Sequence, residues 1–513
     1  MSMSEEPDLI STLPDSLLSD IVSLLPGTEG VRTCVLSHRW KMVWKNISHL
    51  TFNQRLMLKH LIDAYLEKTH LSTRLVAAFT RKIVPYGDRE NKDPIAQAEM
   101  LINSVLDSHL GSLKRCTLVH MPESCASGEA VAWMKKLAEQ KRVKELSMER
   151  DGPIDLNSVP QLRTVLRDLG RTLDIPFEIF SSFEALELKN YYVKTSPSGA
   201  VPGQTLKTLT LTNVNVEENA WDGILSYCSS LENITLGECS FGVVKISSPR
   251  LKLFKIGKMV VNEINVRARN LVVLEIDTVV CNPQKVIFET PNLQILSCFC
   301  DMTIGRRYVL PGQSKLLTSN EILKAFTGIQ SSQGPTASFA GAFESLVILR
   351  IDLELKLIIN AIALFSALQS CPKLQHLEIN TQSYDAKNHF GGDYDDEPGN
   401  DDDILSYPKR LYWKRRELCE CVENQLKTLC IRGFSGKGLE VEFLKYIITT
   451  SETIQKITVW FIDNCSWAEA TETLCLLSFQ KASKNLSIAI NPGPSYMANV
   501  NGSFEQWVLS LRK

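Results

Sequence analysis

The chain has 513 residues; 44% are apolar and 22% charged, and its 56 basic side chains nearly balance its 58 acidic ones. This composition is typical of a folded soluble protein, and the length suits several domains or an elongated repeat array. The near-neutral balance excludes a long-range attraction to nucleic acid or to an anionic membrane.

The chain begins with an acidic segment that lacks the apolar core of a secretory signal. The apolar stretch 353–368 is interrupted by Glu354 and Lys356, so we expect no transmembrane helix and no membrane partner. The 14 cysteines are dilute and irregularly spaced, which is typical of reduced thiols. We therefore expect a cytoplasmic protein, a nuclear one, or one found in both compartments.

Three short helices are predicted within the first fifty residues. Thr12 is expected to cap the first, with Pro14 in its opening turn, and Thr28 and Ser37 are expected to cap the other two. The first helix carries one apolar stripe formed by Leu17, Leu18, Ile21, Leu24 and Leu25. So small a module leaves some apolar side chains exposed, and such clusters usually bind a partner.

The motifs of this module resemble the F-box, in the form found in plant F-box/leucine-rich-repeat proteins. They are Leu13-Pro14-Asp15-Ser16-Leu17-Leu18-Ser19-Asp20-Ile21, Leu24-Leu25-Pro26 and Thr33-Cys34-Val35-Leu36-Ser37-His38-Arg39-Trp40, followed by Trp44. The resemblance implies that residues 8–52 bind a Skp-type adaptor, and through it cullin and RING subunits. By position it assigns eight residues to this contact: Leu13, Pro14, Leu17, Leu18, Ile21, Val35, Leu36 and Trp40. From the residues alone, any one of them could equally belong to the module's core.

A repeated phrase follows a helical linker expected at 53–112. It has an apolar residue, two variable residues and then alternating apolar positions, as in Leu206-Lys207-Thr208-Leu209-Thr210-Leu211. Its copies from 183 to 293 begin 23, 25, 20, 20 and 22 residues apart, the spacing of leucine-rich repeats. Degenerate copies begin at Leu113 and Val143. Because one repeat cannot bury its own apolar face, we predict a curved solenoid over 113–411, with insertions near 303–342 and 383–412.

The segment 412–461 resembles the FBD module that follows leucine-rich repeats in plant F-box proteins. It contains Leu426-Lys427-Thr428-Leu429-Cys430-Ile431-Arg432-Gly433-Phe434 and Phe443-Leu444-Lys445-Tyr446-Ile447-Ile448, although Trp413 lacks the usual following proline. We expect a strand, a glycine turn, an amphipathic helix and a second strand, with 462–513 capping the array. The fold class is therefore α/β: a small three-helix F-box, a curved leucine-rich-repeat solenoid and an FBD-like C-terminal part.

The sequence does not favour an enzyme. It contains no Walker-type loop, no Gly-x-Ser-x-Gly elbow and no His-Glu-x-x-His helix, so no catalytic residue and no cofactor are assigned. The close pairs Cys298/Cys300 and Cys419/Cys421 lack two further ligands at zinc spacing, so no metal is assigned. The acidic run 393–403 is either a solvated loop or a docking site for a basic degron. The basic residues near Trp413 are not expected to bind nucleic acid, given the net charge of −2.

Two functional hypotheses remain. In the first, the chain is the non-catalytic substrate-recognition subunit of an SCF-type (Skp-cullin-F-box) ubiquitin ligase. It would bind an unknown protein target through its repeats and promote ubiquitination and proteasomal degradation. In the second, it is an interaction scaffold that uses its F-box and repeats without assembling a ligase. A small-molecule co-ligand on the repeats would be a variant of the first.

Overall fold

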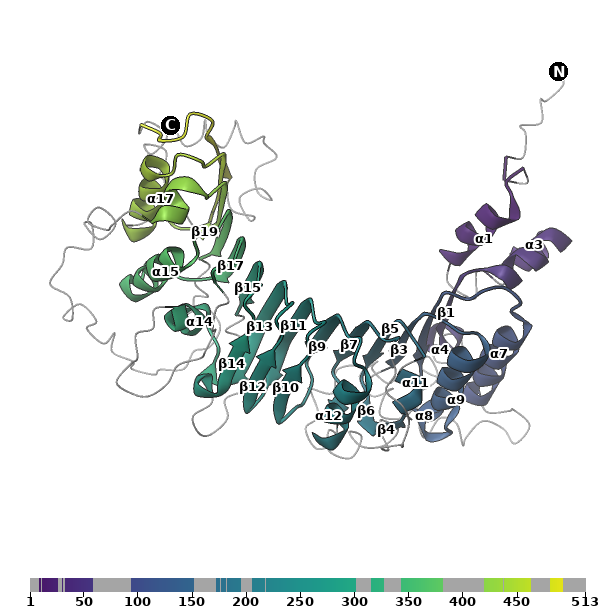
Figure 1. The fold of residues 1–513 in the computed structure, drawn as a ribbon. Helices are drawn as coiled ribbons and strands as arrows, with labels where there is room; N and C mark the ends of the chain where they lie inside the picture. The colour runs from purple at the N-terminus through teal and green to yellow at the C-terminus, as the bar shows by residue number, and fades with distance from the viewer. Residues whose placement is uncertain are drawn as a thin grey trace, which may run out of the picture. The chain divides into compact units, whose positions relative to one another are not determined.

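The computed structural model describes residues 9–10, 12–25, 30, 33–58, 94–151, 172–175, 177–180, 182–194, 205–216, 218–300, 315–326, 343–381, 419–436, 438–462 and 480–491. The chain divides into two compact units, residues 1–241 and 242–513. Each unit contains a long parallel sheet built from the repeated phrase, with helices and short strands behind it (Figure 1).

The strands of the first unit pair in parallel, each with the next copy of the phrase. Buried and partly exposed side chains alternate along them, so Leu186, Leu209 and Ile234 stand in register in the core. The strands are β1 (His49–Asn53), β2 (Arg115–His120), β3 (Glu145–Arg150), β5 (Ala185–Lys189), β7 (Thr208–Thr212) and β9 (Asn233–Gly237).

The second unit continues the same pattern. Parallel pairing runs from β11 to β21, and β16 (Lys315–Leu316) adds an antiparallel pair to β13. Phe254, Leu274 and Leu296 are in register and fully buried. The parallel strands are β11 (Leu253–Val260), β13 (Val273–Cys281), β15 (Ile295–Phe299), β17 (Ile348–Asp352), β18 (His376–Asn380), β19 (Thr428–Phe434), β20 (Lys456–Phe461) and β21 (Ser487–Asn491).

Return segments cover the apolar face of each sheet. In the first unit they form α7 (Pro94–Ser108), α8 (Glu123–Ala126), α9 (Glu129–Lys135) with the π-helical turn η4 (Lys136–Gln140), α11 (Phe177–Phe180), α12 (Glu218–Tyr227) and the strands β4 (Thr172–Asp174), β6 (Tyr192–Lys194) and β8 (Asn215–Val216). In the second they form β10 (Val243–Ser247), β12 (Glu263–Arg267), β14 (Val286–Glu289), η6 (Pro283–Lys285), α14 (Ser319–Phe326), α15 (Ile358–Ser370), α16 (Glu420–Asn424) and α17 (Gly438–Thr450).

At equivalent points of several repeats, directly after β5, β7 and β9 and within β11 and β13, the chain bends through a residue with a left-handed backbone. These residues are Asn190, Asn213, Glu238, Lys258 and Thr278, whose φ angles lie between 51° and 67°. Asparagine tolerates this conformation better than residues with longer or branched side chains. The backbone turn therefore recurs even where the sequence no longer carries the expected asparagine.

The predicted repeat strands are confirmed, including the degenerate copies that begin at Leu113 and Val143. The sheet nevertheless starts earlier than expected, because β1 pairs with β2 and the predicted F-box boundary at residue 52 falls inside β1. The expected linker contains α4 (Gln54–Met57) and α7, while its residues 59–93 lie outside the described part. The curvature predicted for the solenoid stays a prediction.

The C-terminal predictions are confirmed in their order of elements. Strand β19 contains Gly433 with a positive φ near its end and is followed by Gly436, also with a positive φ, and then by α17 and β20. Strand β21 extends the sheet within the predicted cap. The first predicted insertion is not wholly irregular, since α14 lies within it; the second, with its acidic run, lies almost wholly outside the described residues.

The apolar stretch 353–368 contributes to helix α15, which packs into the core through Leu364, Phe365 and Leu368. Among the described residues, no helix combines the length and apolar character needed to span a bilayer.

Candidate adaptor-binding surface

Helix α1 (Asp15–Ser23) presents two apolar faces rather than one stripe. Leu18 and Val22, four residues apart, are 0% and 1% exposed and form its inner face. Leu17, Ile21 and Leu24 follow the same helical spacing on the outer face, and are 48%, 47% and 85% exposed. A helix turns about 100° per residue, so adjacent leucines at 17 and 18 necessarily point in different directions.

The inner face of α1 packs against α3 (His38–Val43) and the 3₁₀ turn η2 (Trp44–Asn46), where Val43 and Trp44 are buried. Ser37 caps α3 as predicted, accepting a 3.4 Å hydrogen bond from the Trp40 amide. The expectation for α1 is corrected: Pro14 occupies its N-cap, and the Thr12 hydroxyl donates instead to the Leu9 carbonyl. The second predicted helix is a 3₁₀ turn, η1 (Thr33–Val35), and its expected cap Thr28 lies outside the described residues.

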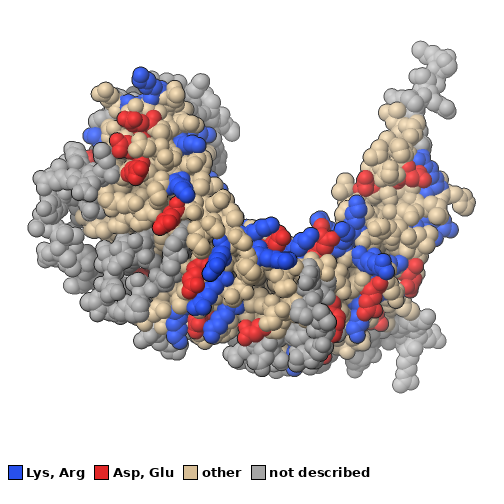
Figure 2. All heavy atoms as spheres, viewed as in Figure 1, with Lys and Arg blue, Asp and Glu red and all other residues tan. Residues whose placement is uncertain are grey.

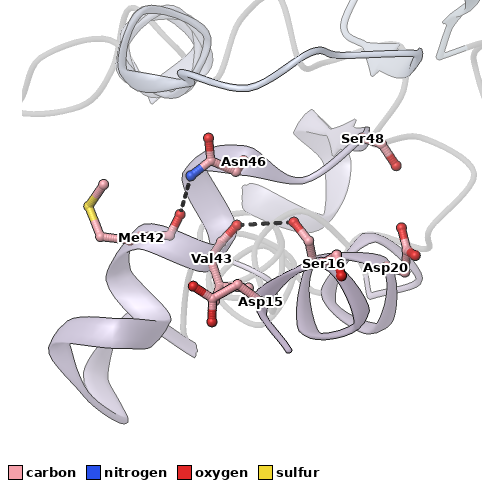
Figure 3. Close-up of a pocket in the computed structure, with 8 residues that line it drawn as sticks. Asp15, Ser16, Asp20, Met42, Val43, Asn46 and Ser48 are labelled. Atoms are coloured by element: carbon pink, nitrogen blue, oxygen red, sulfur yellow. Dashed lines mark hydrogen bonds between the residues drawn. The ribbon is translucent and has the colours of Figure 1, made fainter. Parts of the chain in front are cut away.

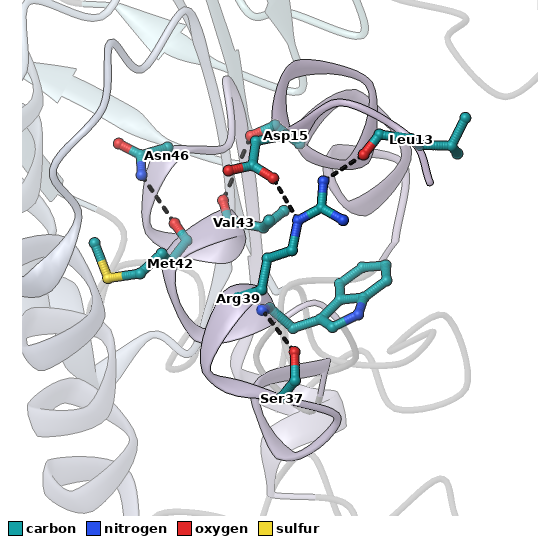
Figure 4. Close-up of polar contacts among 9 residues, drawn as sticks. Leu13, Asp15, Ser37, Arg39, Met42, Val43 and Asn46 are labelled. Atoms are coloured by element: carbon teal, nitrogen blue, oxygen red, sulfur yellow. Dashed lines mark hydrogen bonds and ion pairs between the residues drawn. The ribbon is translucent and has the colours of Figure 1, made fainter. Parts of the chain in front are cut away.

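Arg39 ties the start of α1 to α3. Its Nε atom donates to the Asp15 carboxylate at 2.7 Å, and its Nη2 atom donates to the Leu13 carbonyl (Figure 4). One guanidinium thus holds both the first turn of α1 and the residue before its cap. Sequence reasoning placed Arg39 in the motif but assigned it no role, because only the fold shows that it reaches back across 24 residues.

The outer face of α1 opens into a shallow apolar depression of about 500 Å³. Leu13 and Leu24 line it with Leu17 and Ile21, while Asp20 and His49 supply polar groups at its edge, together with Ser23. The depression therefore offers several unpacked aliphatic side chains on one helix face. A partner helix with apolar residues three or four positions apart could bury them.

A second hollow lies between α1 and the α3–η2 segment, with a volume of about 340 Å³ (Figure 3). Six of the eight residues that line it have polar side chains: Asp15, Ser16, Ser19, Asp20, Asn46 and Ser48, beside Met42 and Val43. The Ser19 hydroxyl donates to the Val43 carbonyl at 3.4 Å, and the Asn46 amide donates to the Met42 carbonyl at 2.8 Å. Asp20 lines both hollows, so it marks the border between the polar and the apolar surface.

The eight residues assigned to the adaptor contact divide by exposure. Leu17, Ile21, Val35, Leu36 and Pro14 are exposed, and Leu13 and Trp40 are partly buried. Leu18 is fully buried, so it supports the outer face from inside the module and is not available to an adaptor in this structure. Val22 is the inner-face residue that sequence reasoning missed; its spacing from Leu18 was the signal that could have found it.

Backbone hydrogen bonds connect the helical module to the first repeats. The Lys45 carbonyl accepts from the amides of Leu110 and Gly111 at 2.8 and 3.1 Å, and the Ser48 carbonyl accepts from Lys114 at 2.8 Å. The His109 Nε2–H donates to the Ile47 carbonyl at 2.8 Å. Burial lowers the pKa of His109, so the ring is neutral and this tautomer carries its proton on Nε2.

Charge on the repeat strands is mostly compensated locally. Examples of such pairs are Arg115–Glu145 between β2 and β3 and Lys255–Glu275 at 2.8 Å between β11 and β13. On the face shown in Figure 2, Lys and Arg spheres accordingly lie beside Asp and Glu spheres. Among the described residues, no group of three or more His, Cys, Asp or Glu could hold a metal ion. Burial raises the pKa of Cys298 and Cys421 to about 12, so both thiols are protonated.

Comparison with known proteins identifies the leucine-rich repeats and the FBD segment. The family described as "FBD-associated F-box protein At5g56370, LRR repeats" matches residues 131–379, and the FBD family matches residues 414–459. Both matches lie within the ranges predicted for the repeats and the FBD segment. Neither includes α1, α3 or η2, so the assignment of these helices to an F-box stays a prediction.

Curated relatives come from Arabidopsis thaliana. "F-box protein At1g80960" is 27% identical over 303 residues, which cover 56% of this chain and 53% of the relative. "F-box protein At3g60790" is 24% identical over 56% of this chain and 52% of its own length. This chain thus spans about half the length of these two relatives. "Putative F-box/FBD/LRR-repeat protein At5g56810" is 24% identical over 88% of this chain and 89% of the relative.

Proposed function

We propose that this chain, which carries the leucine-rich repeats and the FBD segment of the plant F-box/FBD/leucine-rich-repeat family, is the substrate-recognition subunit of an SCF-type ubiquitin ligase. The helices from α1 to η2 act as the F-box and bind a Skp-type adaptor, which brings cullin and RING subunits. The repeats bind the protein target. The chain itself is not an enzyme.

The outer face of α1 is the observation that carries this proposal. Leu17, Ile21 and Leu24 stay exposed although Leu18 and Val22 already complete the contact with α3 and η2. Three aliphatic side chains left on one face of a short helix indicate a missing partner rather than an incomplete core. The depression that they line with Leu13 has room for side chains of an adaptor helix.

The proposed mechanism is proximity. One chain binds the adaptor at its first helices and the target on its strands, which raises the local concentration of target lysines near the charged conjugating enzyme. The backbone contacts between residues 45–48 and 109–115 support this role, because they join the adaptor-binding helices to the first repeats. No covalent step is assigned to any residue of this chain.

The double variant Leu17→Asp plus Ile21→Asp tests the adaptor contact. Two charges in a desolvated apolar contact should weaken co-purification with a Skp-type adaptor by about 100-fold or more. Leu357→Asp is the matched control, because Leu357 is 49% exposed and lies far along the chain at the start of α15. Equal adaptor binding by the double variant and the control would refute the proposal.

The alternative is a scaffold that binds the adaptor without assembling a ligase. The exposed face of α1 supports both hypotheses equally, since it concerns only the adaptor. Detection of cullin in the purified complexes distinguishes the two hypotheses. The ligase is supported if cullin co-purifies with the wild-type chain and is lost with Leu17→Asp plus Ile21→Asp. Adaptor without cullin supports the scaffold.

A further inference from the structure

The open face of the second sheet carries a row of aliphatic side chains. Leu253, Val273, Ile295 and Ile348 occupy the same register position on β11, β13, β15 and β17. Their neighbours along each strand, such as Leu274 and Leu296, point into the core and are fully buried. The row itself is only partly buried, so it presents apolar surface on the side of the sheet away from the core.

The equivalent row of the first unit is different. Ala185, Thr208 and Asn233 occupy this register position on β5, β7 and β9. These side chains are small or polar, and the Asn233 amide donates to the Thr208 hydroxyl at 3.0 Å. The repeat pattern requires apolar residues only on the core side, so the aliphatic row of the second unit is not needed for stacking.

Four residues further along the same strands lies a second feature. Asp277 on β13 is in register with Phe299 on β15, and Asp352 ends β17, next to the end of β15. The Cys300 amide donates to Asp352 at 2.8 Å, and the Asn380 amide donates to it at 3.2 Å. Within the described part of the chain, neither carboxylate forms an ion pair, whereas nearby Arg350 and Glu378 pair with each other at 3.4 Å.

The two carboxylates are close enough to act on each other. Burial raises the pKa of Asp352, and the charge of Asp277 raises it further. A cation placed between the two carboxylates would offset both causes of the raised pKa, because it favours their charged forms. Phe299 is partly exposed and belongs to β15, which pairs with β13 on one side and β17 on the other. An aromatic side chain is thus present beside the two carboxylates, and lysine and especially arginine make contacts with aromatic rings.

We propose that this face of the second sheet binds an extended target segment that has an aliphatic residue and, four residues away, a lysine or arginine. The face is defined by Leu253, Val273, Ile295, Ile348, Asp277, Phe299 and Asp352. The aliphatic side chain packs on the row, and the cation lies over Phe299 between the carboxylates. Four residues of a strand span about 13 Å, and an extended peptide lying along β15 has the same repeat. This inference rests on the proposed function, since it names the surface for its target.

A displayed library of random 12-residue peptides, selected on the full chain, tests this surface. We expect enrichment, by about tenfold or more, of peptides with Leu, Ile or Val followed four positions later by Lys or Arg. Asp277→Asn plus Asp352→Asn should remove the preference for a basic residue and keep the aliphatic one. Val273→Asp should abolish enrichment, whereas Thr210→Asp, on the open face of the first unit, should leave it unchanged.

Enrichment of acidic peptides, no enrichment, or the same motif with every variant would overturn the proposal. Adaptor binding is measured on each protein in parallel. A chain that selects the motif but binds no adaptor refutes the ligase function and leaves the peptide surface standing.

Discussion

A methyl group added to Gly111 would lie 2.8 Å from the Cα atom of Asn46. The absence of a side chain at Gly111 is what lets the loop after α7 approach η2, where the amides of Leu110 and Gly111 share the Lys45 carbonyl. Two of the backbone hydrogen bonds that join the α1–η2 helices to the repeats thus depend on this close approach.

Gly111→Ala should therefore loosen this join. The clash is with backbone, which cannot move aside as a flexible side chain would, so we expect a local loss of about 1–3 kcal/mol. Hydrogen exchange of residues 45–48 and 109–115 should become faster. Gly237→Ala is the control, because its new methyl group would meet nothing closer than 3.9 Å. Equal protection in the two variants would contradict this account of the join.

Leu17 and Leu18 should differ strongly in the effect of truncation on stability. Leu18→Ala empties a fully buried site and should destabilise the α1–α3 module by about 2–5 kcal/mol. Leu17→Ala removes an exposed side chain and should change stability by no more than about 0.5 kcal/mol. Hydrogen exchange of residues 15–47 measures the difference. A large loss of protection in Leu17→Ala would show that the outer face belongs to the core.

The repeats could be predicted from the sequence because their signal is local and recurs. A buried residue every second position fixes a strand, and spacing near 20–25 residues fixes the stacking. The first strand was missed because His49–Asn53 follows the helical motifs directly and has no preceding copy of the phrase. Its partner Arg115 lies 66 residues later, so nothing local indicates the pairing.

The division of α1 into an inner and an outer face could be only partly predicted, for a different reason. Helical spacing identifies which residues share a face, and it separates Leu17 from Leu18, but it does not say which face the module will cover. That choice depends on where α3 packs, and on the reach of Arg39 to Asp15 and Leu13. The aliphatic row of the second sheet was equally hidden, because it exists only once the strands are in register.

Glu238→Asn should stabilise the first unit. Glu238 has a φ of 54°, a conformation that costs an ordinary side chain about 1 kcal/mol and asparagine less. At the equivalent position Asn213 also donates to the Asn190 side chain at 2.8 Å, and Asn190 donates to the Arg150 carbonyl at 2.9 Å. We expect a gain of about 0.5–1 kcal/mol, seen as slower hydrogen exchange in β7 and β9. Asn213→Ala should have the opposite effect, and faster exchange in Glu238→Asn would disprove the argument.

His120 should make the first unit sensitive to mild acid. Its Nδ1–H donates to the Met121 carbonyl at 2.8 Å, and its Nε2 accepts from the Tyr191 hydroxyl at 2.6 Å, so the folded state holds the neutral ring. Burial, together with the charge of Arg150, lowers the pKa of His120 to about 4, although the hydrogen bond to Met121 acts in the opposite direction. The unfolded chain binds this proton near pH 6.5, so stability is full above that pH and is lost as the pH falls toward 4.

The expected loss from His120 is about 3 kcal/mol over this range, by the free energy equivalent of its pKa shift. His120→Gln can still donate to Met121 and accept from Tyr191, but it does not titrate. The difference in unfolding free energy between the wild-type chain and this variant should therefore shrink or reverse as the pH falls from 7 to 4. Carboxylates with raised pKa values, such as Asp151, are present in both proteins and cancel in the difference. If the unfolding free energies of the wild-type chain and the variant changed in parallel with pH, His120 would not be buried in its neutral form.

Glu440 and Ser435 should be energetically coupled at the turn that opens α17. Both side chains are fully buried, and one Glu440 oxygen accepts from the amide and the hydroxyl of Ser435, each at 2.7 Å. Burial raises the pKa of Glu440, while the Ser435 donors lower it by binding the charged form. Ser435→Ala removes one of those donors and should destabilise the FBD segment by about 1.5–3 kcal/mol at pH 7, the range for hydrogen bonds to charged groups.

The sign of the pH effect follows from the raised pKa. The folded state holds its proton to higher pH than the unfolded chain does, so the contribution of Glu440 to stability falls as the pH rises through its folded pKa. Ser435→Ala raises that pKa further, so its effect should be larger at pH 7 than at pH 4.5. In a Glu440→Gln background the lost hydrogen bond joins neutral groups, and the same substitution should cost about half as much. Hydrogen exchange of β19 and α17 in the four proteins measures the coupling, and strictly additive losses at both pH values would show that Ser435 does not stabilise the charge on Glu440.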